Sequence, residues 1–208
     1  MRQHLSGRII VQLSTSTPQE ASDSEDLLNA AGALYLDGAI DCGPGDIDTP
    51  STLVLVSGNE AAFEQARRFL ESLGGETRYL GPNVRAASVL ALASVCEAYG
   101  RFMAVTHAAC ICDSEGVDLD ALAKMFPEDS FSQRYIDVIN SSDYQNPGGT
   151  LRVWGAAIQR IRKQASDAGI HTGFPDYVVE WFEKAIDEGY GDEHVMALFK
   201  VMRSMNND

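Results

Sequence analysis

The sequence changes character at Gly81, and this change constrains the fold more than any other feature. Before Gly81, short runs rich in β-branched and apolar residues alternate with amphipathic stretches, which predicts strands alternating with helices. The expected strands are Ile9–Leu13, Leu34–Ile40, Thr52–Gly58 and Thr77–Gly81. After Gly81 the pattern is helical throughout. The sequence therefore predicts an α/β part followed by an all-α part.

Helix-capping signals support the strand and helix alternation before Gly81. Thr17 suits the N-cap of a helix that runs to about Asn29, and Pro18 suits its first turn. Glu20, three residues after Thr17, can complete a capping box. Asn59 is placed to cap the next helix, from Glu60 to about Leu73.

The second part begins with a long apolar run from Ala86 to Cys112. A helix of about 27 residues would span about 40 Å, and apolar residues on all its faces indicate burial on most sides. A part this small cannot cover such a helix, so we expect a second copy to help and predict a homodimer. Further helices are expected at 118–126, 130–140, 150–168, 175–188 and 192–203, with Asp118 and Asp192 as caps.

The predicted domain boundary follows from these patterns. Residues 1–81 form the α/β domain, and residues 82–208 form a helical domain that includes the long helix 86–112.

Charge and composition exclude several classes of partner. The chain has 30 acidic and 16 basic residues, a formal net charge of −14, which disfavours nucleic acid and anionic membranes. The sequence contains no uninterrupted run of about 18 apolar residues, so we expect no membrane span. The N-terminus lacks the pattern of a secretory signal, so we expect no secretion. The four cysteines lack zinc-site spacing, so we expect no metal and a reduced, cytoplasmic protein.

The order of the motifs resembles one family in particular. The segments "VQLSTSTPQEA", "GALYLDGAI", "DTPSTLVLVSG", "FLESLGGETRYLG" and "AIDEGYGDEHVMALFKVMR" occur in this order along the chain. They resemble the imine reductases and reductive aminases, members of the 3-hydroxyisobutyrate dehydrogenase-like superfamily. The resemblance implies a partial Rossmann sheet, a long interdomain helix and an all-α C-terminal domain. It also implies NADP as cofactor, a small-molecule ligand and a homodimer.

One element of that family is missing from the sequence. The resemblance implies an earlier βαβ unit with a G-x-G-x-x-G turn that holds the dinucleotide diphosphate. The 208 residues contain no G-x-G-x-x-G, and the nearest match, Gly43-Pro44-Gly45, precedes an acidic stretch rather than a helix. We therefore expect a truncated Rossmann domain, doubtful NADPH binding, and reduction only with a separate N-terminal Rossmann chain.

The family's catalytic position departs from its pattern here. The resemblance places Leu90 or Ala91 where relatives carry a proton-handling side chain on the long helix. Tyr99, eight residues further, matches a position where relatives often present an aromatic side chain to the substrate. With His107 and Asp41 it forms our candidate catalytic set. The alternatives are a packed tyrosine, a hydrogen-bonded histidine and a solvated turn aspartate.

Two further groups of residues are candidates for binding substrate. Ser14 and Thr15 follow the first strand, at the edge where open α/β sheets bind ligands. The resemblance places Asp41 and Cys42, in the segment "DGAIDCGPG", in the substrate-binding loop of the hydroxyacid dehydrogenases. Local capping is the alternative role for the two hydroxyls. From the helical domain, Phe131, Tyr135 and Trp154 could complete an apolar pocket contributed by a partner chain, although aromatics at helical spacing also build cores.

Three interpretations remain open from the sequence. The first is an imine-reductase-like protein that cannot reduce substrate alone. The second is an isomerase, cyclase or lyase that uses no redox cofactor and acts on an imine-like metabolite. The third is a dimeric scaffold or binding protein without catalysis.

Overall fold

The computed structural model describes residues 4–42, 47–145 and 147–204. The chain forms two compact units, residues 1–94 with 163–170, and residues 95–162 with 171–208. Each unit is described by itself below. The Gly43-Pro44-Gly45 sequence lies outside the described residues.

The first unit contains a four-stranded sheet in the order β1-β2-β3-β4. The strands are β1 (Ile9–Gln12), β2 (Leu34–Asp41), β3 (Leu53–Gly58) and β4 (Glu76–Tyr79). β1 and β2 are parallel, β2 and β3 antiparallel, and β3 and β4 parallel. The four strands expected from the sequence are confirmed, and β1 is an edge strand of the described sheet.

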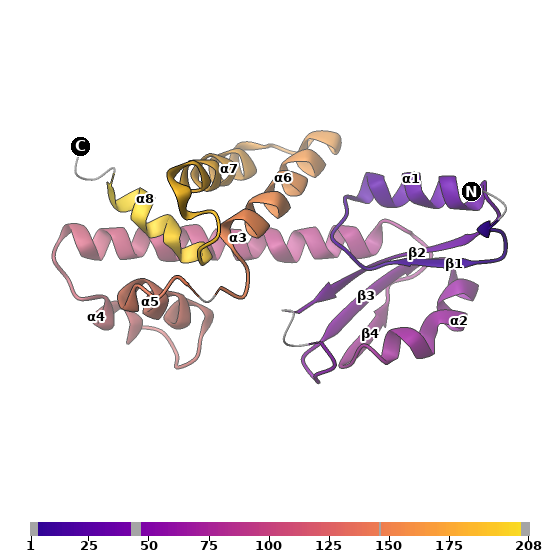
Figure 1. Ribbon diagram of the computed structural model, residues 1–208, viewed down its shortest axis with the longest axis horizontal. Helices are drawn as coiled ribbons and strands as arrows, with labels where there is room; N and C mark the ends of the chain where they lie inside the picture. The colour runs from indigo at the N-terminus through magenta and orange to yellow at the C-terminus, as the bar shows by residue number, and fades with distance from the viewer. Residues whose placement is uncertain (1–3, 43–46, 146, 205–208) are drawn as a thin grey trace. The chain divides into compact units, whose positions relative to one another are not determined.

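Helices α1 (Pro18–Asn29) and α2 (Glu60–Glu71) lie on opposite faces of this sheet (Figure 1). The capping box predicted for α1 is confirmed: the Thr17 hydroxyl accepts from the Glu20 amide at 3.2 Å, and the Glu20 carboxylate accepts from the Thr17 amide at 2.7 Å. The predicted cap of α2 is also confirmed, because the Asn59 side chain accepts from the Ala62 amide at 2.9 Å.

The two faces of β2 have different surroundings. Side chains alternate along a strand, so Leu36 points to one face while Tyr35 and Asp37 point to the other. Leu36 is buried in an apolar core together with side chains of β3 and α2: Val54, Val56, Ala62, Phe63 and Leu70. The opposite face therefore carries the polar residues of the strand.

The long helix α3 runs from Ala86 to Ser114, two residues beyond the expected end at Cys112. Its first residues, to Ser94, belong to the first unit, and the rest belongs to the second. By length and composition it is apolar enough to span a membrane, a test that core helices of soluble proteins also pass. In its most apolar window, 33% of the residues are buried, so the described chain leaves much of this helix uncovered.

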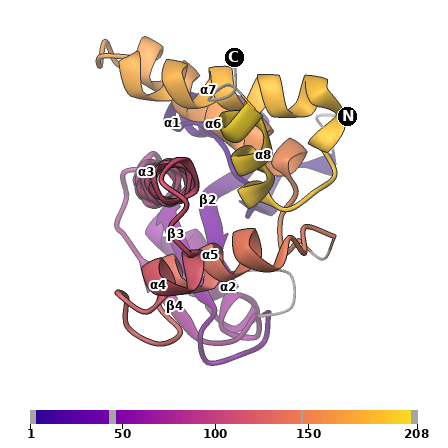
Figure 2. The ribbon, with the colours of Figure 1, turned by 90° about the vertical axis from the view of Figure 1, so that its left-hand side faces the viewer.

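The second unit packs shorter helices around the remainder of α3. These are α4 (Leu119–Ala123), α5 (Phe131–Ser141), α6 (Leu151–Asp167), α7 (Gly173–Ala185) and α8 (Leu198–Ser204), with a π-helical turn at Ile186–Tyr190 and a 3-10 turn at Val195–Ala197. The end of α6, from Lys163, belongs to the first unit. α4 and α5 lie on one side of α3 and α7 on the other (Figure 1, Figure 2). The expected helical domain is thus confirmed in its elements.

The prediction that Asp192 caps the last helix is wrong. The backbone of His194 pairs with Thr150 in an isolated β-bridge, and the Leu151 amide donates to the Glu193 carbonyl at 2.9 Å. Because this pairing keeps the chain extended, helical structure begins only at Val195. His194 is the cap instead, its Nδ1 accepting from the Met196 amide at 3.1 Å.

Candidate functional site

The most unusual polar group of the first unit is the carboxyl of Asp37, which is fully buried. It accepts from the Ser88 amide at 3.1 Å, from the Ser16 hydroxyl at 3.2 Å and from the Tyr35 hydroxyl at 3.3 Å. The Ser88 hydroxyl also donates to it. Burial raises the pKa of Asp37, and these hydrogen bonds partly oppose that rise.

Asp37 and its strand neighbour hold the N-terminus of α3. Asp37 pairs in register with Ser57 of β3. The Ser57 hydroxyl accepts from the Ala87 amide at 3.0 Å and donates to the Val84 carbonyl at 2.9 Å. Two adjacent sheet residues therefore satisfy the first-turn amides that a helix leaves unpaired. We call Ser16, Tyr35, Asp37, Ser57 and Ser88 the α3 anchor.

The anchor bears directly on whether a dinucleotide fits this unit. A diphosphate binds well at a helix N-terminus because unpaired amides and the helix dipole attract it. At α3, the Asp37 carboxylate takes that place. At α1, the Thr17 and Glu20 side chains occupy the N-terminus through the capping box, and Pro18 has no N–H that could bind a phosphate. At α2, Asn59 caps a first turn that begins with Glu60.

The three described helices that start in the first unit are thus capped by protein groups. The first turns of α1 and α2 contain a glutamate, and the first turn of α3 donates to the Asp37 carboxylate. A diphosphate would be repelled there rather than held. Within the described residues, the helix N-termini of this unit do not fit the diphosphate of NADPH.

The predicted site residues of the first unit lie at the C-terminal ends of β1 and β2. Ser14 and Thr15 are exposed in the loop after β1, Asp41 is exposed at the end of β2, and Cys42 is half-buried. The strand register pairs Gln12, the last residue of β1, with Asp37. Asp41 therefore lies four residues beyond the end of β1, about 13 Å along the strand.

Sequence reasoning missed Asp37 and Ser88. A signal was present, since Asp37 is the one charged residue within the apolar run "LYLDGAI". The resemblance favours Asp41 instead, because its segment "DGAIDCGPG" corresponds to the family's substrate-binding loop. The register explains the difference, because it places Asp37 and not Asp41 level with the loop after β1.

In the second unit, Tyr99 is fully buried within α3. Its hydroxyl donates to the Trp154 carbonyl, and its ring meets Trp154, Phe102 and Phe182 edge-on, with centroids 5.7, 5.9 and 5.5 Å away. Burial raises the pKa of Tyr99 far above its usual range. In this structure the side chain fills a core.

The three other predicted aromatics join the same cluster. Phe131 and Tyr135 lie 4.3 Å apart between ring centroids, and Phe102 contacts Phe131 at 5.6 Å and Trp154 at 5.0 Å. The structure therefore brings Tyr99, Phe131, Tyr135 and Trp154 together as an aromatic cluster built around Phe102. Phe131, Tyr135 and Trp154 are only half-buried.

His107 does not belong to this cluster. It is exposed and lines a separate hollow of about 370 Å³ between α3, α7 and α8. The other lining residues are Cys110, Ile111, Ser114, Tyr177, Trp181 and Met202. On α3 it lies eight residues from Tyr99, which is about 12 Å along the helix.

The catalytic position of the resembled family has no ionisable side chain. Leu90 is 47% exposed on α3, and Ala91 beside it is half-buried. Neither can donate or accept a proton.

Comparison with known proteins decides the family. Residues 84–204 match the family model of the NADPH-dependent reductive aminase-like C-terminal domain. This chain belongs to that family. Residues 1–81 match the NAD-binding domain of 6-phosphogluconate dehydrogenase. The chain is thus a member of an NAD(P)-dependent oxidoreductase family, as the motif order suggested.

Individual relatives agree with this assignment. An NADPH-dependent reductive aminase from Aspergillus oryzae is 28% identical over 214 residues, covering 99% of this chain and 72% of the relative. An imine reductase from Myxococcus stipitatus, solved with NADP+, is 26% identical with a TM-score of 0.58 over 96% of this chain and 72% of its own.

The fold is shared more widely. A 3-hydroxyisobutyrate dehydrogenase from Salmonella typhimurium is 19% identical, with a TM-score of 0.79 over 93% of this chain and 69% of that one. The small sheet, long helix and helical C-terminal part are those of the 3-hydroxyisobutyrate dehydrogenase-like fold, which confirms the predicted fold class.

Proposed function

We propose that this chain is the substrate-side part of an NADPH-dependent imine-reducing protein, and that the 208-residue chain does not transfer hydride alone. One observation carries the proposal. In the part of this unit that the structure describes, the N-termini of α1, α2 and α3 are capped by protein groups with a carboxylate nearby, so these N-termini do not fit the diphosphate. The cofactor would then be held by protein other than the described residues, such as a separate N-terminal Rossmann chain.

The catalytic position supports the same proposal independently. Leu90 and Ala91 cannot supply the proton that imine reduction requires, and a positioned acid typically contributes a factor of about 10² to 10⁴ to the rate. Asp37 is no substitute in this structure, because its carboxyl is fully buried and committed to the α3 anchor.

We propose further that the chain is a cytoplasmic homodimer. Much of the most apolar window of α3 is not covered by the described chain. Leu90 and Ile111 on α3 and Phe174 and Tyr177 on α7 are between 39% and 56% exposed. A second copy would remove these apolar side chains from water, which is the main stabilising term in obligate dimers.

The test is a reduction assay with the purified 208-residue chain, NADPH and a cyclic imine. We expect no NADPH consumption above the rate without protein. Light scattering on the same sample should give the mass of a dimer. Stoichiometric NADPH consumption with formation of the amine would contradict the proposal, and a folded monomer at micromolar concentration would contradict the dimer.

A further inference from the structure

The second unit contains a cavity that the proposed function does not use. It has a volume of about 390 Å³, within the range of small-ligand sites. Its described lining comes from the loop after α5 and from α8: Ser142, Tyr144, Phe199, Lys200 and Arg203. None of these residues belongs to the aromatic cluster or to the α3 anchor.

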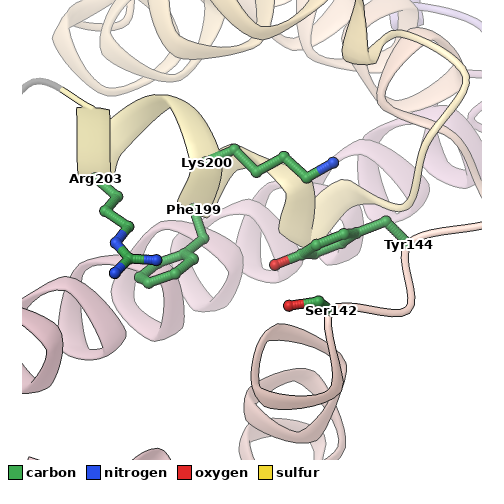
Figure 3. A pocket seen from close by; sticks show the side chains of 5 residues that line it. All are labelled: Ser142, Tyr144, Phe199, Lys200 and Arg203. Carbon is green, nitrogen blue, oxygen red and sulfur yellow. The ribbon is translucent and has the colours of Figure 1, made fainter.

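Two hydroxyl groups point into the same part of this cavity. Figure 3 shows the Ser142 and Tyr144 hydroxyls directed to one side, where Phe199 and Arg203 lie. Ser142 ends α5 with a left-handed φ of 54°, which turns the chain so that Tyr144 follows on the cavity wall. Tyr144 is only 4% exposed, so its ring is packed within the protein. Its hydroxyl faces the cavity (Figure 3).

Tyr144 is held rigidly and remains a hydrogen-bond donor. The Lys200 ammonium lies 4.5 Å from the centre of the Tyr144 ring and 4.6 Å from that of Tyr190. The Tyr144 carbonyl accepts from the His194 amide at 2.9 Å. Burial and the Glu193 carboxylate raise the pKa of Tyr144 to about 12, although a hydrogen bond with the Ser142 side chain opposes the rise. The Tyr144 hydroxyl therefore keeps its proton at neutral pH.

The charged side chains of the described cavity lining are all cationic. The described lining carries two cations, Lys200 and Arg203, and no carboxylate, although the chain as a whole has a net charge of −14. The carboxylates that orient these cations do not line the cavity: Glu193 lies 2.5 Å from Lys200, and Asp113 lies 2.8 Å from Arg203. Each cation is therefore already paired with a carboxylate, and that carboxylate lies outside the described lining.

We propose that this cavity binds a small oxyanion, a carboxylate or phosphate group, which accepts hydrogen bonds from the Ser142 and Tyr144 hydroxyls beside the Arg203 guanidinium. Hydroxyl donors and a guanidinium are the groups that proteins use for such anions. The Phe199 ring would contact the apolar part of a ligand that carries the group. This site is independent of imine reduction.

Calorimetric titration of the whole chain with inorganic phosphate at pH 7 and constant ionic strength tests the site. We expect saturable binding, and a loss of about tenfold in affinity for Tyr144→Phe, because a hydrogen bond to a charged group is lost. The matched control is Tyr190→Phe. This change removes a hydroxyl from the other ring that contacts Lys200 but lies outside the lining, and should leave the affinity unchanged.

Ser142→Gly is the second variant. Glycine accepts the left-handed φ, so the change removes the hydroxyl without straining the backbone, and it should also weaken binding about tenfold. It keeps the test valid if Tyr144→Phe fails to fold. Repeating the titration with acetate separates a phosphate site from a carboxylate site, and saturable binding of either anion supports the proposal.

Absence of saturable binding for both anions would overturn the proposal. Equal loss of affinity in Tyr144→Phe and Tyr190→Phe would overturn it as well, because the effect would then act through Lys200 and the fold rather than through a hydroxyl in the cavity.

Discussion

Asp37 in the first unit and Tyr99 in the second are both fully buried ionisable residues whose pKa is raised by burial. Their surroundings differ. Asp37 accepts hydrogen bonds from one amide and three hydroxyls and so joins the sheet to the start of α3. Tyr99 lies among aromatic rings, and its hydroxyl donates to the Trp154 carbonyl. One residue stabilises a junction by polar contacts, and the other stabilises a core by packing.

The comparison shows why a buried ionisable group does not by itself indicate catalysis. Both side chains have their polar atoms satisfied by protein, which is the usual state of buried polar groups. The four predictions that follow separate packing from polar anchoring in these two residues.

The largest effect is expected for Tyr99→Ala. Removing a buried aromatic ring leaves a cavity beside Phe102, Trp154 and Phe182, and should lower the free energy of unfolding by about 4 kcal/mol. Urea denaturation of the purified chain measures it. A loss below about 1 kcal/mol would mean that Tyr99 is not a core residue.

The second largest effect is expected for Asp37→Ala, which should lower the free energy of unfolding by about 3 kcal/mol. The reason is that the buried Ser88 amide and the surrounding hydroxyls would lose their hydrogen-bond acceptor. Asp41→Ala is the matched control on the same strand. Its carboxyl is exposed, so the free energy of unfolding should change by no more than about 0.5 kcal/mol. Equal losses for the two variants would show that the α3 anchor is not what stabilises this region.

Tyr99→Phe isolates the hydrogen bonding of the tyrosine hydroxyl. The ring contacts remain and the Trp154 carbonyl loses its donor, so we expect a loss of about 1 kcal/mol. Tyr99→Phe and Asp41→Asn, made as separate variants, test the predicted catalytic roles of Tyr99 and Asp41. If the chain turns over any ligand through these groups, each variant should abolish that turnover without changing the oligomeric state of the chain.

The smallest effect concerns pH. The pKa of Asp37 is raised in the folded protein, so the folded state binds the proton more tightly than the unfolded state does. Its stabilising contribution is therefore present at low pH and is lost as the pH rises through the folded pKa. Asp37→Asn cannot titrate. The free energy of unfolding of the natural chain, minus that of the variant, should increase as the pH falls from 7 to about 4. A decrease would show that the hydrogen bonds outweigh burial.

Local signals in the sequence predicted much of the fold. The capping box at Thr17 and Glu20 and the cap at Asn59 depend only on neighbouring residues, and both were confirmed. The start of the last helix was missed, because a β-bridge between His194 and Thr150, 44 positions apart, delays it. Contacts of that kind leave no local pattern.

The candidate site shows the same division. The sequence singles out Tyr99 as a catalytic candidate and Phe131, Tyr135 and Trp154 as substrate-binding candidates, but their packing together around Phe102 could not be predicted from it. The α3 anchor depends on strand register, which aligns Asp37 with the end of β1 and pairs it with Ser57. Sequence alone gives the residues but not the register.

Among the described residues, the helix N-termini of the first unit are already capped by protein groups and do not fit the diphosphate of NADPH. Titration of the purified chain with NADPH by calorimetry tests this most directly. We expect no saturable binding up to about 1 mM NADPH. Saturable binding with a micromolar dissociation constant, at one site per chain, would contradict it.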